Sequence, residues 1–493
     1  MAVTDRLSGP SFTIEPHLRR VMIVVVLGSI MSVLDTTIVN IALDSLSRDL
    51  HAPLSSIQWV VTAYLLALAA VIPINGWAVR RFGARRLYLI ALVLFTASSA
   101  LCAFASSSTE LIFFRAIQGV GGGLLVPTGL TVLVKAAGPE NLPRVMSLFG
   151  VPVVLAPVFG PTLGGVLLQS AGWRWIFVIN VPIGIVTFIV ALRLLAHDFP
   201  TSDEHDRLDV VGLFLAVAGV VGVTYGLSES DSAGSLSAPA VVIPVIVGIV
   251  LVAVFVIRSS RISFPLLDVG LYRNRAFSAA SIVTGVLGAA LFGGLILLPL
   301  YFQVARGQDA IHTGLLLIPQ SAGSAAGMFL SGRSTKRLGA GLTSFVGAII
   351  LLAATAPFLF LTESTSYVFI SVIMLVRGIG VGLSIMPSMT AAFAVLTHDQ
   401  IGDASPQLNV VQRVGGSLGT AVVAVAVQAK ITHLGRDPTP VQLAGAFAHT
   451  YWWVVGLTCV ALVPTAILWR IERQVRTEGR ATPPPEDMLL ELP

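Results

Sequence analysis

The chain has 493 residues, of which 55% are hydrophobic and 11% charged, with a formal net charge of +5 and a mean hydropathy of +0.88. A soluble domain carries about 25% charged residues, so this composition excludes a water-exposed globular protein and favours a chain whose outer face meets lipid. The basic residues lie in short segments between apolar runs, which indicates membrane topology and argues against nucleic acid as a partner.

Fourteen apolar runs are long enough to cross a bilayer as helices. A hydrocarbon layer of about 30 Å needs about 20 apolar residues, and only a helix satisfies its own backbone hydrogen bonds there at this hydropathy. In chain order, the predicted spans are Val21–Leu43, Ser56–Val79, Leu87–Ala105, Leu111–Val134, Val145–Leu168, Trp175–Ala196, Val210–Leu227, Val241–Ile257, Ala276–Phe302, Thr313–Leu330, Leu342–Leu361, Tyr367–Leu396, Val410–Ala429 and Tyr451–Trp469. The first run contains Asp35 and has no small-residue cleavage site after it, so we expect a retained helix.

The basic residues predict the orientation. Most of the 30 Lys and Arg residues fall on one side when the N-terminus is placed inside. The contrast is sharpest between the arginine-rich loop after the second span and the loop after the seventh, which has no Lys or Arg. Because positive loops stay inside, we expect a multi-pass protein of the cytoplasmic (inner) membrane with both termini cytoplasmic.

An internal repeat divides the chain into two six-helix bundles. Gly76, Arg80, Arg81, Phe82, Gly83 and Ala84 after the second span recur at the same spacing as Gly332, Lys336, Arg337, Leu338, Gly339 and Ala340 after the tenth. Arg115 of the fourth span is likewise echoed by Arg377 of the twelfth. Such halves recur in transporters, with a substrate site between them. The predicted fold is therefore an all-α polytopic membrane protein. Its parts are a cytoplasmic N-terminus (1–20), a bundle (21–196), a linker with two inserted spans (197–275), a bundle (276–469) and a cytoplasmic tail expected to be disordered (470–493).

Asp35 is the carboxylate that we place near the middle of a span. Ionised and unpaired, it would cost at least about 2.5–3.5 kcal/mol there, so it must protonate or pair with a cation. Arg115 lies at a similar predicted depth and cannot deprotonate, which makes it the candidate partner. The pattern favours proton coupling. Its alternatives are a static ion pair, an Arg115 that reaches the external headgroups, and a Gln118 that bonds only to its own helix.

Two further segments suggest conformational roles. The fifth span combines prolines with glycines, a pattern that favours a kinked helix with a close-packing face; its residues are Pro157, Gly160, Pro161, Gly164 and Gly165. The loop after the second span would serve either as a latch between helices or only as a positive-inside signal; its residues are Gly76, Arg80, Arg81, Gly83, Arg85 and Arg86.

Signals for other chemistry are missing from the sequence. The histidines and the two cysteines show no metal-ligand spacing, and we find no phosphate-binding loop or Ser/His/Asp cluster. We therefore expect no metal, no cofactor and no enzymatic activity. The energy source would be an ion gradient, with H⁺ as the coupling ion.

The chain from Arg19 to Arg470 resembles the fourteen-helix drug:proton antiporters of the major facilitator superfamily, the EmrB/QacA-type branch. Five segments carry the likeness beside the loop motif: Leu34–Leu43, Arg115 with Gln118, Gly119 and Gly121, the fifth-span group Gly160, Pro161, Gly164 and Gly165, Trp173–Gly184, and Gln412–Gly419. The resemblance implies that Asp35 couples protons, that Arg115 assists, and that the fifth helix sets antiport. In two places the chain departs from the branch: Arg80 stands where an acid is usual, which loses or inverts any latch salt bridge, and Asp44 replaces a proline.

These observations predict proton-driven efflux of lipophilic small molecules by alternating access. Thr36, Asn40, Gln118, Asn180 and Gln412 are the candidate cavity residues. One central carboxylate suits lipophilic monocations or neutral compounds. Alternatives are export of a specific metabolite, siderophore or lipid, import, and a receptor, channel or membrane enzyme. Membrane lipid is an expected partner, and a periplasmic adaptor is expected only in a two-membrane cell. The sequence leaves the oligomeric state open.

Overall fold

The computed structural model describes residues 15–195, 208–229, 235–262, 265–397, 400–434 and 438–481, and every regular element in those ranges is helical. The N-terminal half contains α1 (Pro16–Ile38), η1 (Val39–Ala42), α2 (Leu43–Asp49), α3 (Leu54–Val71), η2 (Ile72–Ile74), α4 (Asn75–Phe82), α5 (Ala84–Phe104), α6 (Ser108–Ala171), α7 (Arg174–Val178) and α8 (Asn180–Leu194). The inserted pair is α9 (Val210–Ser228) and α11 (Pro239–Ser259). The C-terminal half contains η3 (Val269–Arg273), α12 (Arg275–Leu300), η4 (Tyr301–Ala305), α13 (Ala310–Leu338), α14 (Ala340–Thr355), η5 (Ala356–Phe360), α15 (Tyr367–Ala394), α16 (Ile401–His433) and α17 (Pro440–Ala481).

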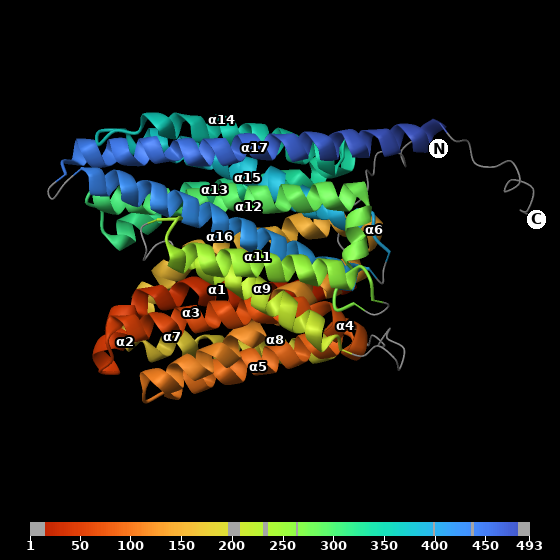
Figure 1. Cartoon of the computed structure of the whole chain (residues 1–493), viewed down its shortest axis with the longest axis horizontal. Coiled ribbons are helices and arrows are strands. Elements are labelled where there is room, and N and C mark those ends of the chain that lie inside the picture. Colours follow the sequence, from red (N-terminus) through yellow and green to blue (C-terminus); the bar gives the residue numbers. More distant parts are fainter. Residues whose placement is uncertain are drawn as a thin grey trace, which may run out of the picture.

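The helices form a long bundle with the two halves side by side (Figure 1). Most of α1 to α8 lie in the lower part of the view and α12 to α17 in the upper part, while α9 and α11 lie between them; the long α6 extends from the lower group to the upper one. Large apolar side chains point outward along the bundle, including Phe104 at 84% exposure, Val368 at 73% and Phe214 at 68%. Such an apolar surface would be unfavourable in contact with water, whereas contact with lipid carries no such cost.

Twelve helices in the described part of the chain are long and apolar enough to cross a membrane. The two other predicted spans, Val145–Leu168 and Thr313–Leu330, are also helical and lie in α6 and α13, so fourteen spans stay a prediction. Helix α6 runs for 64 residues, far beyond the thickness of a bilayer. Its backbone breaks at Gly138, where φ is 63°, and this break separates the predicted fourth and fifth spans.

Several helix ends differ from the predicted ones, and three of these differences bear on the site or the domain boundaries. The first span leaves the α-helical state at Val39, where η1 leads into α2. Helix α16 begins at Ile401, nine residues before the predicted start, since the polar first turns are covered by the other half. Helix α17 continues to Ala481, which corrects the expectation of a disordered tail from residue 470; residues 482–493 lie outside the described ranges.

The halves meet at one end of the bundle, which carries Arg80, Arg81, Lys336 and Arg337 and is called the basic end here. There Gly332 lies against Ser147, and Gly150 lies against Met328 and Met386. Toward the opposite end, two separate hydrophobic clusters appear, one built only from the N-terminal half and the other only from the C-terminal half. The halves are therefore joined at the basic end and packed independently at the other.

Candidate functional site

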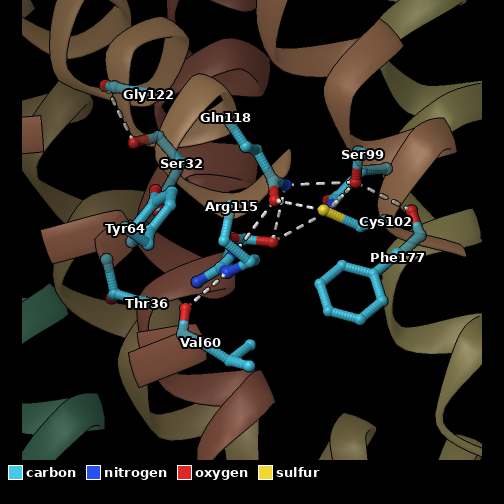
Figure 2. Close-up of polar contacts among 12 residues, drawn as sticks. Ser32, Thr36, Val60, Tyr64, Ser99, Cys102, Arg115, Gln118, Gly122 and Phe177 are labelled. Carbon is cyan, nitrogen blue, oxygen red and sulfur yellow. Dashed lines mark hydrogen bonds and ion pairs between the residues drawn. The ribbon is translucent and has the colours of Figure 1, made fainter. Parts of the chain in front are cut away.

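A buried ion pair between Asp35 of α1 and Arg115 of α6 lies at the centre of the N-terminal half. Both side chains are 0% exposed. Helix α1 is held against its neighbours one turn earlier, where the Ser32 hydroxyl donates to the Gly122 carbonyl at 3.0 Å and the Tyr64 hydroxyl donates to the Ser32 carbonyl at 3.1 Å (Figure 2). The predicted contact between Asp35 and Arg115 is present.

The carboxylate of Asp35 is surrounded by amide donors. Its Oδ1 accepts from Gln118 Nε2 at 3.0 Å and from Asn180 Nδ2 at 3.1 Å, while Oδ2 accepts from Arg115. Both amides also donate to Ser99 Oγ at 3.1 Å, and Ser99 in turn donates to the Phe177 carbonyl at 3.0 Å. Such a closed set of bonds stabilises an ionised carboxylate in an apolar interior, because its oxygens find donors.

Arg115 is held by several elements at once. Its Nε donates to the Val60 carbonyl at 3.0 Å, and Nη1 donates to Gln118 Oε1 at 2.8 Å as well as to Asp35. The guanidinium stacks over the Tyr64 ring, 4.0 Å from its centre, a cation–π contact that is strong when desolvated. Nη2 is buried and has no partner in the described part of the chain. A shift of this arginine would therefore be transmitted to α1 and α3 together.

The candidate cavity residues separate into two groups. Gln118 and Asn180 are 0% and 4% exposed and bond to Asp35, so they hold the ion pair and do not line an open surface. Thr36 and Gln412 are partly exposed; the Thr36 hydroxyl donates to its own helix at Val33, and the Gln412 backbone and side chain pack near Gly288 of α12. The side chain of Asn40 lies outside the described residues.

The glycines of the fifth span pack against α1 beside Asp35. A Cβ at Gly160 would meet Thr37 Oγ1 at 2.1 Å, and one at Gly164 would meet Ile38 at 2.8 Å. The predicted small-residue face is therefore present between α6 and α1. A Cβ at Gly165 would meet nothing within 4 Å in the described structure, so this glycine lies off that face. The side chains of Pro157 and Pro161 lie outside the described residues.

Arg80 forms an ion pair that joins the two halves at the basic end. Its Nη1 pairs with Asp403 Oδ1 in the first turn of α16, and its Nη2 donates to the Pro265 carbonyl at 3.3 Å. Gly76 lies directly beneath Asp403, since a Cβ there would meet Asp403 Oδ1 at 2.3 Å. Of the two outcomes expected for the departure at Arg80, inversion is the one observed: the loop carries the cation and the opposite half carries the acid.

The rest of the loop motif shapes the turn. Gly83 has φ of 81°, a backbone conformation that L side chains rarely adopt, and its repeat counterpart Gly339 has φ of 97°. Arg85 donates to the Leu192 carbonyl at 2.8 Å, while Arg81 and Arg86 are exposed. The repeat therefore reflects a shared backbone geometry at both helix junctions.

Sequence reasoning missed three residues of these two sites and the depth of a fourth residue, Arg413, in its helix. Ser99, Tyr64 and Asp403 are polar groups within or beside apolar runs, and only the packing brings them to Asp35, Arg115 and Arg80. The apolar pattern places Arg413 near the predicted start of a span, at Val410. In the structure it lies well inside α16, which begins at Ile401. Its polar neighbours Asp403, Gln407 and Asn409 could have signalled that the helix begins earlier.

Two packed helical halves, one of which seals a carboxylate–arginine pair at its own centre, are typical of a polytopic membrane transporter. The family model described as "Major Facilitator Superfamily" matches residues 25–420. The chain belongs to this superfamily and is an integral membrane transporter.

Named relatives agree with the family. The chain is 38% identical over 413 residues to "Multidrug resistance protein B homolog" of Mycobacterium tuberculosis, with 83% of this chain and 76% of that one covered. It is 33% identical to "Methylenomycin A resistance protein" of Bacillus subtilis, covering 84% and 88%. It is 31% identical to "Multidrug export protein EmrB" of Haemophilus influenzae, covering 80% and 78%. The crystal structure of the human organic anion transporter MFSD10 aligns with a TM-score of 0.64 over 92% of this chain and 100% of that one. Its 16% identity supports the fold alone.

Proposed function

We propose that this protein is a secondary active multidrug exporter that exchanges lipophilic small molecules for protons across the cytoplasmic membrane. The buried Asp35–Arg115 pair carries the proposal, because a carboxylate sealed beside a permanent cation changes the local net charge when it binds a proton. The names of the relatives support the drug-export part, since three of them at 31–38% identity are called multidrug resistance, methylenomycin A resistance or multidrug export proteins.

Protonation of Asp35 is the proposed coupling step. A proton from outside converts the carboxylate into a neutral acid, which removes the counter-ion of Arg115. Removing one charge of a buried ion pair leaves the other uncompensated, at a cost of about 3–5 kcal/mol. Movement of the guanidinium to other acceptors would lower this cost. Because Arg115 also holds Val60 and stacks on Tyr64, its movement would shift α6 against α1 and α3. Release of the proton to the inside restores the pair.

The proposed orientation assigns the basic end to the cytoplasm, in keeping with the positive-inside rule. The arrangement then corresponds to an outward-facing state, because the halves are joined at the basic end by Arg80 and Asp403 and packed separately at the other. Rocking of the halves about the midplane would open the cytoplasmic side. An adaptor protein in a two-membrane cell would extend the same export path.

The test is the Asp35→Asn variant. Substrate efflux driven by the proton gradient should fall to background in cells loaded with a lipophilic dye, and proton release on dye addition should disappear in inverted vesicles. Exchange of labelled for unlabelled dye in the absence of a gradient should persist, which shows that the variant folds and binds. Glu140→Gln, which removes an exposed carboxylate away from both ion pairs, serves as the control and should keep proton release. Gradient-driven efflux retained by Asp35→Asn would contradict the proposal.

A further inference from the structure

Arg413 of α16 lies deep in the membrane-spanning part of the bundle. Helix α16 begins at Ile401, so Arg413 lies about 18 Å along the axis from its start. A hydrocarbon layer is about 30 Å thick, which places this arginine near the middle. A charge at that depth is expensive and marks a functional site by default.

The side chain of Arg413 faces the N-terminal half. Gly402 lies against Val79 on this face, and the Ser405 hydroxyl donates to the Pro127 carbonyl of α6 at 2.9 Å. Residues three or four apart share a helix face, and the steps from 402 through 405 and 409 lead to 413. Arg413 also lies close enough to Tyr64 of α3 for an electrostatic interaction.

Other faces of α16 are occupied by different helices. Gly415 and Gly419 pack against Gly285 and Ala289 of α12. Val414 packs with α9, at Val223 and Leu227. Since α9 packs against α3 as well as α16, it covers the lipid side of the boundary between the halves. The partial exposure of Arg413 is therefore directed into the boundary between the halves.

Arg413 differs from the other two arginines of the spans. Arg115 and Arg377 are 0% and 1% exposed and donate to side chains around them. Arg413 is partly exposed, and its guanidinium has no hydrogen bond or ion pair with any residue that the structure describes. Arg stays charged, so five donors and a full positive charge face the boundary between the halves.

The charge balance at the middle of the bundle is therefore positive. Asp35 is sealed at 0% exposure and already neutralised by Arg115, so it presents no charge to a molecule between the halves. This balance argues against the monocations that, with neutral compounds, are expected from a central carboxylate at Asp35 alone.

We propose that Arg413 is a substrate-binding residue that selects lipophilic molecules carrying one anionic group, above all carboxylates, through a charge-assisted hydrogen bond. This rests on the proposed exporter function and names its substrate class. A carboxylate matches the guanidinium in a bidentate geometry, and an apolar body would lie along the boundary between the halves. A cation at the same place would meet uncompensated repulsion.

Equilibrium binding to the purified full chain tests the proposal without energised transport. The probes are fluorescent 1-pyrenebutyrate, its uncharged methyl ester and the cationic dye ethidium, in phosphatidylcholine vesicles that contain no anionic lipid to occupy Arg413. Wild type should bind pyrenebutyrate at least about tenfold more tightly than the ester, a difference of about 1.4 kcal/mol. Arg413→Gln should remove this preference while changing ester binding less than about twofold. Arg413→Lys, which keeps the charge, should retain part of it.

Two results would overturn the proposal: equal binding of acid and ester by wild type, or equal weakening of both by Arg413→Gln with Arg413→Lys no better. The second result means a structural role. Arg413→Glu should move the preference toward ethidium, and its failure to do so while the protein remains monodisperse also counts against selection by charge. If all three probes bind as expected but none is exported in cells, the exporter function fails and the binding assignment stands.

Discussion

Each half of the protein buries one arginine at the repeated position, but only the N-terminal half places an acid beside it in the described structure. Arg115 pairs with Asp35, whereas Arg377 donates to Gln320 Oε1 at 2.9 Å and Thr355 Oγ1 at 3.3 Å. Next to Arg377 stands Gly294, where a Cβ would meet Nη2 at 2.1 Å. One half therefore pairs its arginine with a protonatable group, and the other holds its arginine with neutral acceptors.

This difference indicates that the two repeated halves have different roles in the conformational change. A buried cation held only by neutral acceptors cannot respond to protons, since Arg does not deprotonate. It ties α15 to α13 and α14 through Gln320 and Thr355. If protons drive the change as proposed above, we infer that it begins in the N-terminal half and that the C-terminal half acts as the more rigid body.

Replacing each of the two arginines by glutamine, one at a time, should give the largest difference between the halves. Arg115→Gln leaves Asp35 buried without its cation. The uncompensated buried charge costs at least about 3 kcal/mol, and we expect gradient-driven efflux to be about 100-fold slower. Arg377→Gln removes no ion pair in the described structure, so we expect less than about tenfold loss and proton release that still accompanies transport. Initial dye efflux in cells and proton release in inverted vesicles measure both. Equal loss of proton release in the two variants would show that the halves do not differ in this way.

Giving the C-terminal half an acid should have a smaller effect, on stability. Gly294→Asp places a carboxylate beside Arg377, with Gly294→Asn as the matched uncharged control. A charge-assisted bond adds about 1.5–3 kcal/mol, so Gly294→Asp should unfold at a higher temperature than Gly294→Asn in detergent. Indistinguishable melting curves would mean that Arg377 is already fully compensated.

Inverting the ion pair between the halves should have the smallest effect. The side chains of Arg80 and Asp403 are 21% and 10% exposed, so solvent screens them, and the pair contributes about 0.2–1 kcal/mol. Arg80→Asp and Asp403→Arg alone should each change efflux about two- to fivefold. The double variant should recover most of it, though not all, because a cation in the first turn of α16 opposes the helix dipole. Arg86→Asp, on an exposed side chain of the same loop, is the control. Single variants no different from this control would remove the latch from the mechanism.

The sequence by itself determined that the chain lies in lipid, that it is helical, that it contains a repeat and that Asp35 must be neutralised. Apolar runs of about 20 residues have one stable structure in lipid, and an acid inside one of them must be neutralised. These conclusions need only composition and local spacing. The contact between Arg115 and Asp35 could also be predicted from the sequence, because the depth of each residue in the membrane can be counted from the ends of its helix.

Only the tertiary structure decided which side chains meet. Gln118 and Asn180 turned out to hold Asp35 instead of lining an open surface, because rotation of each helix about its axis is set by packing against its neighbours. Asp403 became the partner of Arg80 across more than three hundred residues of sequence. Arg413 was predicted near the start of a span but lies near its middle. The polar first turns of α16 are covered by the other half, and the helix therefore begins at Ile401.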